Sequence, residues 1–490
     1  MRVVLLPPDE RPVHRRDPEA LAAIAGAPLD LPPADLLPDF HEPGDTDGLA
    51  RWLRQVGPAA DAVVVSVEGL CHGGLVPSRM TDDPVEQVVA RLAPLRDLRT
   101  AVPSLTVDAT AVVTRLPDLD DATEEPEYWA SHGADLARWS RALHTGDGIA
   151  AARADLPDDV AADLLWRRLR NHTLLLATLA LASDGTLDGL VISADDTAPL
   201  GLPAREAAWL DGWIAGLAPG HLVERYAGAD EVASVRLVRW LRGRAEAPRI
   251  HVLDEPGLDR IAPYEGVPIR ETARGQVASI GGRVVDDPAA ADLVLAVAPP
   301  DGDGDWALDP LPDDTDRDAH HLAFADRIAG LVDAGVWVAV ADCFLPNGGS
   351  PVLVDRLLER GVLARLGAYA GWNTAGNSIG SALAQAVIGR GRGGPGTPHE
   401  RLLAHRLVED VGYMTRVRTA VRRERHAAGL PQEPEAVEQE EIAGQIALEL
   451  GRWLDGLGEL GTRWAVDPTS VRLPWGVTFA CDLSLEATDG

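Results

Sequence analysis

Lysine is absent from this sequence, in which all 45 basic residues are arginine. Its absence excludes a lysine that forms a Schiff base with substrate, the phosphate-binding lysine of a P-loop and a lysine that acts as catalytic base. The arginines are outnumbered by 76 acidic residues, which leaves a formal net charge of −31. Because such a chain repels polyanions, we expect neither nucleic acid nor an anionic membrane as a partner.

Cysteine and long apolar runs are also scarce. The three cysteines, Cys71, Cys343 and Cys481, lie far apart and form no CxxC pair, so the sequence predicts neither a disulfide framework nor a structural zinc site. No run approaches the ~18 apolar residues of a membrane span. The N-terminal residues MRVVLLPPDERP hold too short an apolar run for a signal peptide, and we expect a cytoplasmic protein.

Short apolar runs bounded by turn residues alternate along the chain with helical patterns, which predicts parallel β-strands joined by helices. The first run, RVVLL, ends in Pro7 and Pro8. No G-x-G-x-x-G motif follows it, so we expect no dinucleotide, and nothing else in the sequence predicts a cofactor. The expected strands lie at residues 2–6, 61–67, 105–113, 190–194, 221–226, 249–253, 284–285, 293–297, 336–341 and 366–370.

The alternation of strands and helices is typical of a (β/α)₈ barrel with insertions. We therefore predict an α/β fold with a TIM-barrel-like catalytic domain at residues 1–390. A mostly helical insertion is expected at about 117–186. The alternative is a pair of doubly wound α/β domains that divide near residue 245, because successive βα units also build open parallel sheets.

The C-terminal part of the chain is expected to be mostly helical. The glycine-rich residues 389–396 read as a boundary loop, and residues 397–490 as a C-terminal helical region. Long helices are predicted near 399–427 and 433–457. A closing strand is predicted within 471–485, where it would pack back on the main domain.

Two adjacent carboxylates follow the expected strand at 190–194. Asp195 and Asp196 come directly after its last residue, and Pro199 breaks the chain soon afterwards. A carboxylate pair at the mouth of a buried strand is costly unless it is solvated, paired or used in chemistry. Because α/β proteins build active sites at the carboxyl ends of their strands, we predict that this pair is catalytic. The alternative is that an aspartate here only caps the next helix.

Further polar side chains stand at the ends of the other expected strands. In a barrel these ends converge on one face, so we predict a single pocket rich in carboxylates and amides, with a tryptophan to stack on the ligand. Such a pocket suits sugars, whose hydroxyls bind polar groups and whose apolar face packs on aromatic rings. The residues predicted to bind substrate are Asp9, Arg11, Glu68, His72, Arg115, Asp254, Asp342, Asn347, Trp372, Asn373 and Asn377.

The segment VISADDTAP, residues 191–199, resembles the strand–Asp–Asp segment of retaining N-acetylhexosaminidases that use substrate assistance. In those enzymes the first carboxylate orients the 2-acetamido group of the substrate, whose oxygen attacks the anomeric carbon. The second carboxylate is the general acid and then the general base. The resemblance implies that Asp195 orients the acetamide and Asp196 transfers the proton. It implies a glycosidase that acts on β-GalNAc or β-GlcNAc.

Motifs spread over nearly the whole chain resemble an uncharacterised bacterial family, a domain of unknown function. They are PPDERPV near the N-terminus, EGLCHGGLVPSR, EEPEYWA, ISADDTAPLGL, GADEVASVRL and AGWNTAGNSIG. The chain departs from this pattern at Cys481, because an acidic residue is expected soon after Phe479. The family resemblance implies no activity, so the functional prediction rests on the residues themselves.

Two other functions fit the same residues. The first is a carboxylate-bound Mg²⁺, Mn²⁺ or Zn²⁺ site for hydrolysis, built from Asp195, Asp196, His72 and Asp342. The second is a carbohydrate-binding protein without catalysis, since adjacent acids beside a tryptophan serve binding as well. The partner that we predict is a small carbohydrate, and association into a homo-oligomer stays open.

Overall fold

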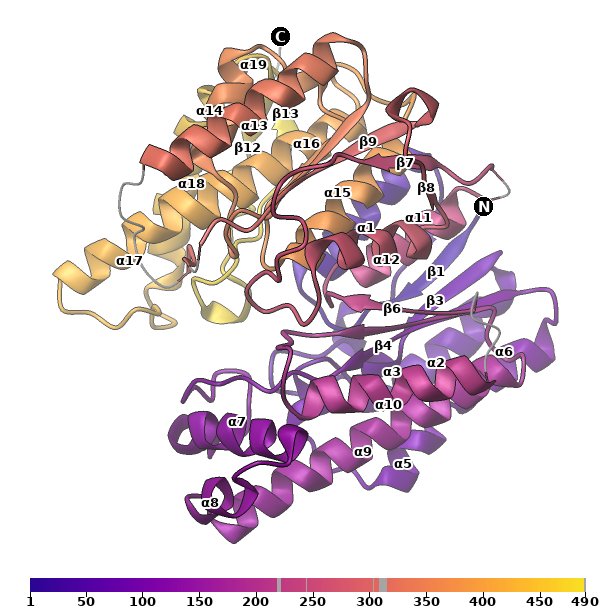
Figure 1. Cartoon of the computed structure of the whole chain (residues 1–490). Coiled ribbons are helices and arrows are strands. Elements are labelled where there is room, and N and C mark those ends of the chain that lie inside the picture. Colours follow the sequence, from indigo (N-terminus) through magenta and orange to yellow (C-terminus); the bar gives the residue numbers. More distant parts are fainter. Residues whose placement is uncertain (218–221, 244, 303, 308–314, 489–490) are drawn as a thin grey trace. The chain divides into compact units, whose positions relative to one another are not determined.

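The computed structural model describes the chain apart from residues 218–221, 244, 303, 308–314 and 489–490. The chain divides into two compact units, and each has its own parallel sheet (Figure 1). Unit 1 comprises Met1–Glu19, Ala27–Gly243 and Tyr264–Val267. Unit 2 comprises Ala20–Gly26, Arg244–Pro263 and Pro268–Gly490.

Unit 1 is built on a six-stranded parallel sheet in the order β2-β1-β3-β4-β5-β6. Its strands are β1 (Val3–Leu6), β2 (Leu29–Asp30), β3 (Ala62–Ser66), β4 (Thr106–Val113), β5 (Gly189–Ala194) and β6 (Val223–Ala227). The first five strands follow the 2-1-3-4-5 order of a doubly wound fold. In such folds ligands bind at the carboxyl ends of the strands, near the point where the order reverses.

Helices cover the sheet of unit 1 on both faces. The helices that follow β1 up to the end of α11 are α1 (Pro12–Ala25), whose last residues belong to unit 2, η1 (Ala34–Leu36), α2 (Thr46–Val56), η2 (Gly57–Ala59), α3 (Val67–His72), α4 (Pro77–Met80), α5 (Val85–Ala90), α6 (Ala93–Ala101), α7 (Trp129–Thr145), α8 (Ile149–Ala154), α9 (Asp158–Ser183), α10 (Leu202–Leu217) and α11 (Val232–Leu241). Val4 and Leu6 of β1 belong to a large buried cluster with α2, α3, α6, α9 and α10. Val3 and Leu5 pack in a second cluster with α11. Because side chains alternate along a strand, the run VVLL supplies both clusters.

Three helices, α7, α8 and α9, lie between β4 and β5, where the sequence predicted a helical insertion. Trp129, Leu136 and Leu164 belong to an apolar cluster formed within this insertion. The insertion therefore carries a small core of its own. The chain that leads from β4 to α7 remains free to supply polar side chains to the carboxyl edge of the sheet.

Unit 2 has a five-stranded parallel sheet in the order β11-β10-β9-β7-β8. Counted from its own first strand, this order is again 2-1-3-4-5, so both units reverse between their first and third strands. The strands are β7 (Arg249–Val252), β8 (Arg283–Val284), β9 (Leu293–Ala298), β10 (Val338–Asp342) and β11 (Ala368–Ala370), and β12 (Trp464–Val466) pairs with β13 (Leu485–Ala487).

One helical stretch of unit 2 contains a π-helix. The helices are α12 (Ile269–Ser279), η3 (Pro288–Ala290), α13 (Thr315–Asp333), α14 (Pro351–Glu359), η4 (Leu363–Arg365), α15 (Ala375–Gly389), α16 (Pro398–Leu407), η5 (Val408–Val417), α17 (Arg418–Ala427), α18 (Gln439–Asp455), α19 (Glu459–Arg463) and η6 (Pro474–Gly476). Helices α16, η5 and α17 follow one another directly, and η5 is the π-helix. π-Helical turns are rare and are frequently found at functional sites.

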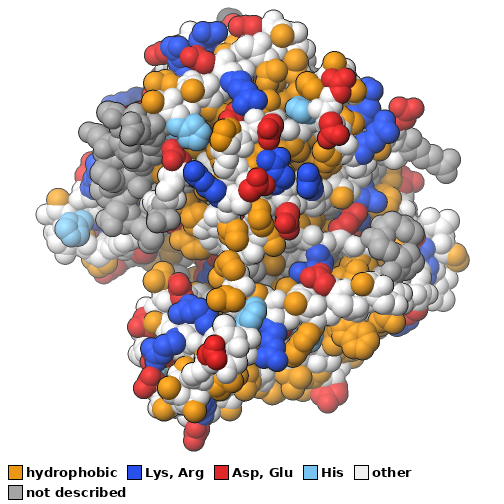
Figure 2. Space-filling model, in the orientation of Figure 1, with side chains coloured by type: hydrophobic (Ala, Val, Ile, Leu, Met, Phe, Trp, Pro, Cys, Tyr) orange, Lys and Arg blue, Asp and Glu red, His pale blue; other side chains and the backbone are white. Residues whose placement is uncertain are grey.

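Charges of both signs are mixed over the surface. On the face drawn in Figure 2, arginine side chains lie among acidic ones, although the net charge is −31. In the part of the chain that the structure describes, no helix has the length and apolar character needed to cross a membrane.

The described strands do not close the single (β/α)₈ barrel predicted from the sequence. They lie in two separate sheets, as in the alternative of two doubly wound domains, and the main division after Gly243 is close to the expected position at 245. Strand and helix alternate in both architectures, so the alternation alone could not separate them. The boundary loop expected at 389–396 lies inside unit 2.

The closing strand predicted within 471–485 is present only at the end of that segment, where β13 begins at Leu485. The segment contains the short turn η6, and the strands β12 and β13 lie before it and at its end. Pro474 has no amide hydrogen to donate to a sheet, and Trp475 has a left-handed φ of 58°. These two residues interrupt the extended backbone that the apolar pattern indicated.

Candidate functional site

Asp195 and Asp196 directly follow β5, at the carboxyl edge of the unit 1 sheet. Their side chains are 13% and 28% exposed. Asp196 has a φ of 35°. Such a left-handed value is uncommon in residues other than glycine, although aspartate adopts it more readily than most, and strained residues of this kind cluster at functional sites. The pair therefore lies in a strained and partly open turn.

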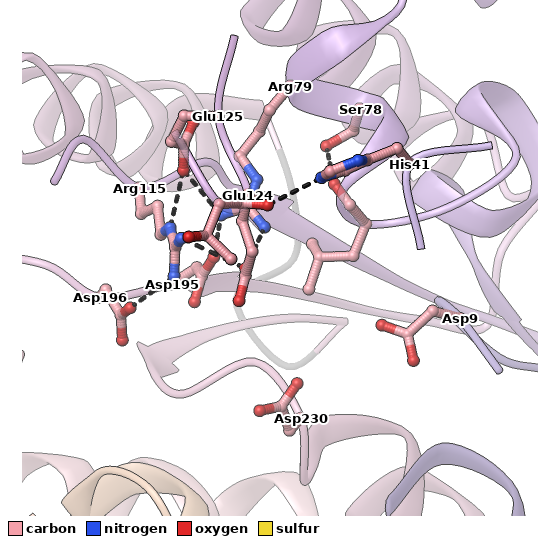
Figure 3. Close-up of polar contacts among 12 residues, drawn as sticks. Asp9, His41, Ser78, Arg79, Arg115, Glu124, Glu125, Asp195, Asp196 and Asp230 are labelled. Carbon is pink, nitrogen blue, oxygen red and sulfur yellow. Dashed lines mark hydrogen bonds and ion pairs between the residues drawn. The ribbon is translucent and has the colours of Figure 1, made fainter. Parts of the chain in front are cut away.

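Arg115 links the aspartate pair to a second pair of carboxylates (Figure 3). It follows β4, and its guanidinium lies 3.1 Å from the carboxylate of Asp196. The same guanidinium lies 3.2 Å from Glu124 and 2.9 Å from Glu125. Both glutamates come from the segment between β4 and α7. The start of the insertion is thus tied to the end of β5 through one arginine.

Arg79, in α4, makes the matching contacts to the other aspartate (Figure 3). It lies 2.9 Å from Glu124 and 3.1 Å from Glu125. Its distance to the carboxylate of Asp195 is 3.6 Å, longer than the contact between Arg115 and Asp196. The side chain of Arg79 is only 4% exposed, so its charge acts with little screening by water.

Burial dominates the protonation of the aspartate pair. Burial, reinforced by the charge of Asp196, raises the pKa of Asp195 to about 7, although Arg79 and Arg115 act to lower it. Burial also raises the pKa of Asp196, against the effect of Arg115. The pair therefore holds a proton near neutral pH. Asp195 is the better site for this proton, because it is less exposed and has the longer arginine contact.

A second charged cluster lies at the ends of β1 and β6. Asp9 follows β1 and Asp230 follows β6, and Arg11 lies 2.8 Å from the first carboxylate and 2.7 Å from the second. His14, in the first turn of α1, lies 2.5 Å from Asp9 through Nδ1 and 3.4 Å from Asp230 through Nε2. Figure 3 shows both aspartates in the same view as the arginine network.

The second cluster is ionised at neutral pH. Burial by itself raises the pKa of Asp230, but Arg11 and His14 outweigh it and lower the pKa to about 2. Burial by itself lowers the pKa of His14, but Asp9 and Asp230 raise it to about 9. The charge of Asp230 also raises the pKa of Asp195, so the two clusters form one electrostatic site.

A glycine lets the first loop of this site approach its neighbour closely. A Cβ atom on Gly69 in α3 would lie 2.3 Å from the carbonyl oxygen of Pro7, so only glycine fits there. The contact holds the loop after β1, which carries Asp9, against the helix that follows β3. Two adjacent strands are thus joined at their carboxyl ends.

Glu68 and His72, both predicted to bind substrate, are buried in α3. The amide of Val112 donates a hydrogen bond of 2.8 Å to Glu68 and so ties this helix to β4. Burial raises the pKa of Glu68 to about 7 and lowers the pKa of His72, which is therefore neutral. Neither side chain is among the described contacts of the aspartate pair.

The remaining predicted residues belong to unit 2. Asp342 ends β10, and its Oδ2 accepts hydrogen bonds from the amide of Ser350 at 2.6 Å and the hydroxyl of Tyr369 at 2.8 Å. Burial raises the pKa of Asp342 to about 6, against these two donors and the nearby amide of Phe344. Asp342 therefore organises the loop that follows its strand.

Asn347 and Asn373 join the loops after β10 and β11. The amide of Asn347 donates to the carbonyl of Asn373 at 2.7 Å. Their φ values are 61° and 58°, in the left-handed region that asparagine tolerates better than most residues. The side chain of Asn347 binds both carboxylate oxygens of Asp305 at 3.0 Å. Asn377 is buried in the first turn of α15.

Two residues predicted to bind substrate, Trp372 and Asp254, have surroundings that differ from those expected of a sugar site. Trp372 is 3% exposed and packs edge-to-face on Phe479, so its ring offers no face for a sugar to stack on. The side chain of Asp254 is 84% exposed and makes a surface ion pair of 3.3 Å with Arg270. A position at the end of a strand does not decide which way a side chain points. The sequence therefore could not show that Trp372 is buried or that Asp254 is exposed at the surface.

The prediction of one pocket assumed one barrel. The structure instead assigns the network around Asp195 and Asp196 to unit 1, and Asp342 to unit 2. The metal ligands considered from the sequence are thus divided between the units. Among the described residues, no group of three or more histidine, cysteine, aspartate and glutamate side chains is arranged to hold a metal ion.

Sequence reasoning missed five side chains of the unit 1 network, namely His14, Arg79, Glu124, Glu125 and Asp230. All of them lie in or beside motifs that the sequence displays, PPDERPV, EGLCHGGLVPSR, EEPEYWA and GADEVASVRL. The signal that could have found them is charge balance. A buried carboxylate pair needs cations within contact distance, and arginine is almost the only cation this chain has.

Residues 3–484 match the sequence profile of a family described as a protein of unknown function, DUF4127. The chain belongs to this family. The expectation that the chain belongs to an uncharacterised family is thus confirmed, and the family description names no activity. No curated protein and no solved structure matches the chain. The functional conclusion therefore rests on the geometry of the unit 1 network.

Proposed function

We propose that unit 1 is a glycoside hydrolase that cleaves N-acetylhexosaminides, of the β-GalNAc or β-GlcNAc type, by a retaining, substrate-assisted mechanism. The observation that carries the proposal is the adjacent Asp195 and Asp196 at the end of β5, which together hold a proton near neutral pH. Two carboxyl groups whose environments favour different protonation states can divide the acid and base roles that glycoside hydrolysis needs.

The charge balance of the network favours a neutral, hydroxyl-rich ligand. Its six carboxylates face three arginines and a protonated histidine, and the aspartate pair among them holds one proton near neutral pH. The network is thus almost neutral, and neither a strong anion nor a strong cation is favoured. A pocket beside it combines polar groups with apolar surface, as sugar sites do. Its charged lining residues are Arg79, Arg115, Glu125, Arg167 and Arg168, and Tyr128, Trp129 and Leu164 supply apolar surface.

The surroundings of the two aspartates favour roles opposite to those implied by the resemblance. Asp195 retains the proton more readily, so we assign it as the general acid. Asp196 lies 3.1 Å from Arg115 and is the carboxylate more readily held ionised, so we assign it to orient the acetamido group. In the first step the acetamido oxygen bonds to the anomeric carbon while the glycosidic bond breaks and Asp195 protonates the leaving oxygen. Water then attacks the same carbon, the bond from that carbon to the acetamido oxygen breaks, and Asp195 takes a proton from the attacking water.

The first test is hydrolysis by the whole chain of aryl β-GalNAc and β-GlcNAc, with aryl β-galactoside and β-glucoside as controls. We expect cleavage of the N-acetyl sugars alone, since only they carry the nucleophile. Activity should fall as the pH rises through about 7, where the pair loses its proton. Cleavage of the plain sugars would contradict substrate assistance, and no cleavage of any substrate would overturn the proposal.

The roles of Asp195 and Asp196 can be separated by comparing substrates whose leaving groups differ in their need for a proton. Asp195→Asn removes the proton donor, so it should lower kcat/KM by about 10² to 10⁴ for a nitrophenyl glycoside and far less for a dinitrophenyl glycoside, whose leaving group needs no proton. Asp196→Asn should lower both rates alike. Asp254→Asn, at an exposed carboxylate, is the matched control and should change neither. If the leaving-group effect follows Asp196 instead, the assignment of roles is reversed.

A further inference from the structure

Unit 2 carries a small pocket of its own at the carboxyl edge of its sheet. The pocket lies where the loops after β7, β10 and β11 meet, which is the side on which doubly wound sheets bind ligands. The side chains that matter for its chemistry are Asp342, Cys343, Asn373, Thr374, Ala375 and Ser378. None of the contacts described for this pocket involves the Asp195 network of unit 1.

One carboxylate oxygen in this pocket lacks a partner. Asp342 is 1% exposed, and its Oδ2 is fully used by Ser350 and Tyr369. Its Oδ1 is buried and, among the residues that the structure describes, receives no hydrogen bond of normal geometry, although the nearby amide of Phe344 acts on the same carboxylate. A buried acceptor without a donor is costly, so its persistence at a pocket indicates a ligand that donates a hydrogen bond there.

A close approach of backbone and side chain places Asp342 in this position. A Cβ atom on Gly349 would lie 2.0 Å from the hydroxyl of Tyr369. Residue 349, in the loop after β10, must therefore be glycine for the loop to approach this side chain so closely. The tyrosine hydroxyl and the Ser350 amide then fix one oxygen of Asp342, a residue that lines the pocket.

The start of α15 faces the same pocket. Thr374, its N-cap residue, and Ala375, its first helical residue, both line the pocket. The side chain of Thr374 makes no capping hydrogen bond, so it does not shield the positive end of this 15-residue helix. The pocket thus joins a carboxylate acceptor to the donor end of a helix.

We propose that this pocket binds a hydroxyl group of a neutral polyol, such as a free sugar, independently of the unit 1 site. A hydroxyl can donate a hydrogen bond to Oδ1 of Asp342 and accept one from the start of α15. The acceptor and the donor side of the pocket would then both have a partner. An ammonium group is disfavoured by the helix, and an anion by the carboxylate. At pH 7.5 Asp342 is mostly ionised, because its pKa lies near 6.

The test uses three matched ligands, glucose, glucosamine and glucuronate, which present the same ring as a neutral, a cationic and an anionic compound. Binding to the full-length Asp195→Asn protein is measured at pH 7.5 by saturation-transfer NMR and calorimetry. We expect glucose to bind best. Asp342→Asn should weaken the binding by at least about tenfold, the loss of a hydrogen bond to a charged group.

A second variant guards against misfolding. Ala375→Val fills the pocket without removing a polar group and should also weaken the binding, while Asp254→Asn, at an exposed carboxylate of the same unit, should not. Thermal unfolding of each variant shows whether it is folded. The proposal is overturned if glucose does not bind, if both pocket variants bind it normally, or if a charged analogue binds more tightly and loses affinity in Asp342→Asn. Failure of sugar hydrolysis by unit 1 would leave this result unaffected.

Discussion

His14 is fully buried between two aspartates and one arginine, and its charge is part of the folded structure. Asp9 and Asp230 raise its pKa to about 9, whereas a histidine in the unfolded chain titrates near 6.5. A group whose folded pKa is raised contributes stability that is complete below the unfolded pKa. This contribution is lost as the pH rises through the folded value. The cluster at the end of β1 is thus sensitive to alkaline conditions.

Removing this histidine should change the pH dependence of stability. We expect the free energy of unfolding of the native chain to fall by on the order of 3 kcal/mol between pH 6.5 and 9.5 through His14. His14→Gln should be less stable at pH 6.5 and should lack this part of the decline. Denaturant unfolding at several pH values measures both. An equal decline in the two proteins would show that His14 is not protonated in the folded state.

The π-helix η5 holds together the loops that follow two strands of unit 2. The π-helix carries Asp410, whose side chain accepts a hydrogen bond of 2.8 Å from the amide of Gly371, just after β11. The backbone oxygen of Asp410 also accepts from the amide of Gly349 at 2.8 Å. One residue of the helix therefore joins the loops after β10 and β11, which carry the pocket of unit 2.

Truncation of the Asp410 side chain should destabilise unit 2. Asp410→Ala leaves the buried amide of Gly371 without its acceptor, so the free energy of unfolding should fall by about 1–3 kcal/mol. Asp410→Asn keeps an acceptor oxygen and should cost less. Denaturant unfolding of the two variants provides the comparison. Equal losses would indicate that the charge of Asp410, and not its acceptor, matters.

At the scale of the whole molecule, each unit has its own sheet and its own buried apolar residues. A chain with two separate cores is not expected to unfold in one two-state step. Calorimetry should therefore show a total enthalpy larger than the van't Hoff enthalpy. His14→Gln should shift one component of the transition and Asp410→Ala the other. A single two-state transition that both variants shift alike would contradict this.

The sequence predicted local features better than their arrangement. The apolar run at 61–67 is the strand Ala62–Ser66, and the expected small strand at 284–285 is the edge strand Arg283–Val284. The carboxylates after β5 stand where the pattern placed them. Trp372 could not be assigned correctly, because its burial depends on Phe479, more than a hundred positions later. The same holds for Arg79, which reaches Asp195 only through folding.

The sequence by itself determined the α/β class, the positions of most strands in the two parallel sheets, the carboxylates at the strand ends and the exclusion of lysine chemistry, because these follow from residue type and short-range pattern. The tertiary structure alone decided the order of the strands, and hence two open sheets in place of one barrel. It also decided which arginines lie beside Asp195 and Asp196. Strand order and charge pairing depend on contacts between distant residues, and a local pattern contains no record of them.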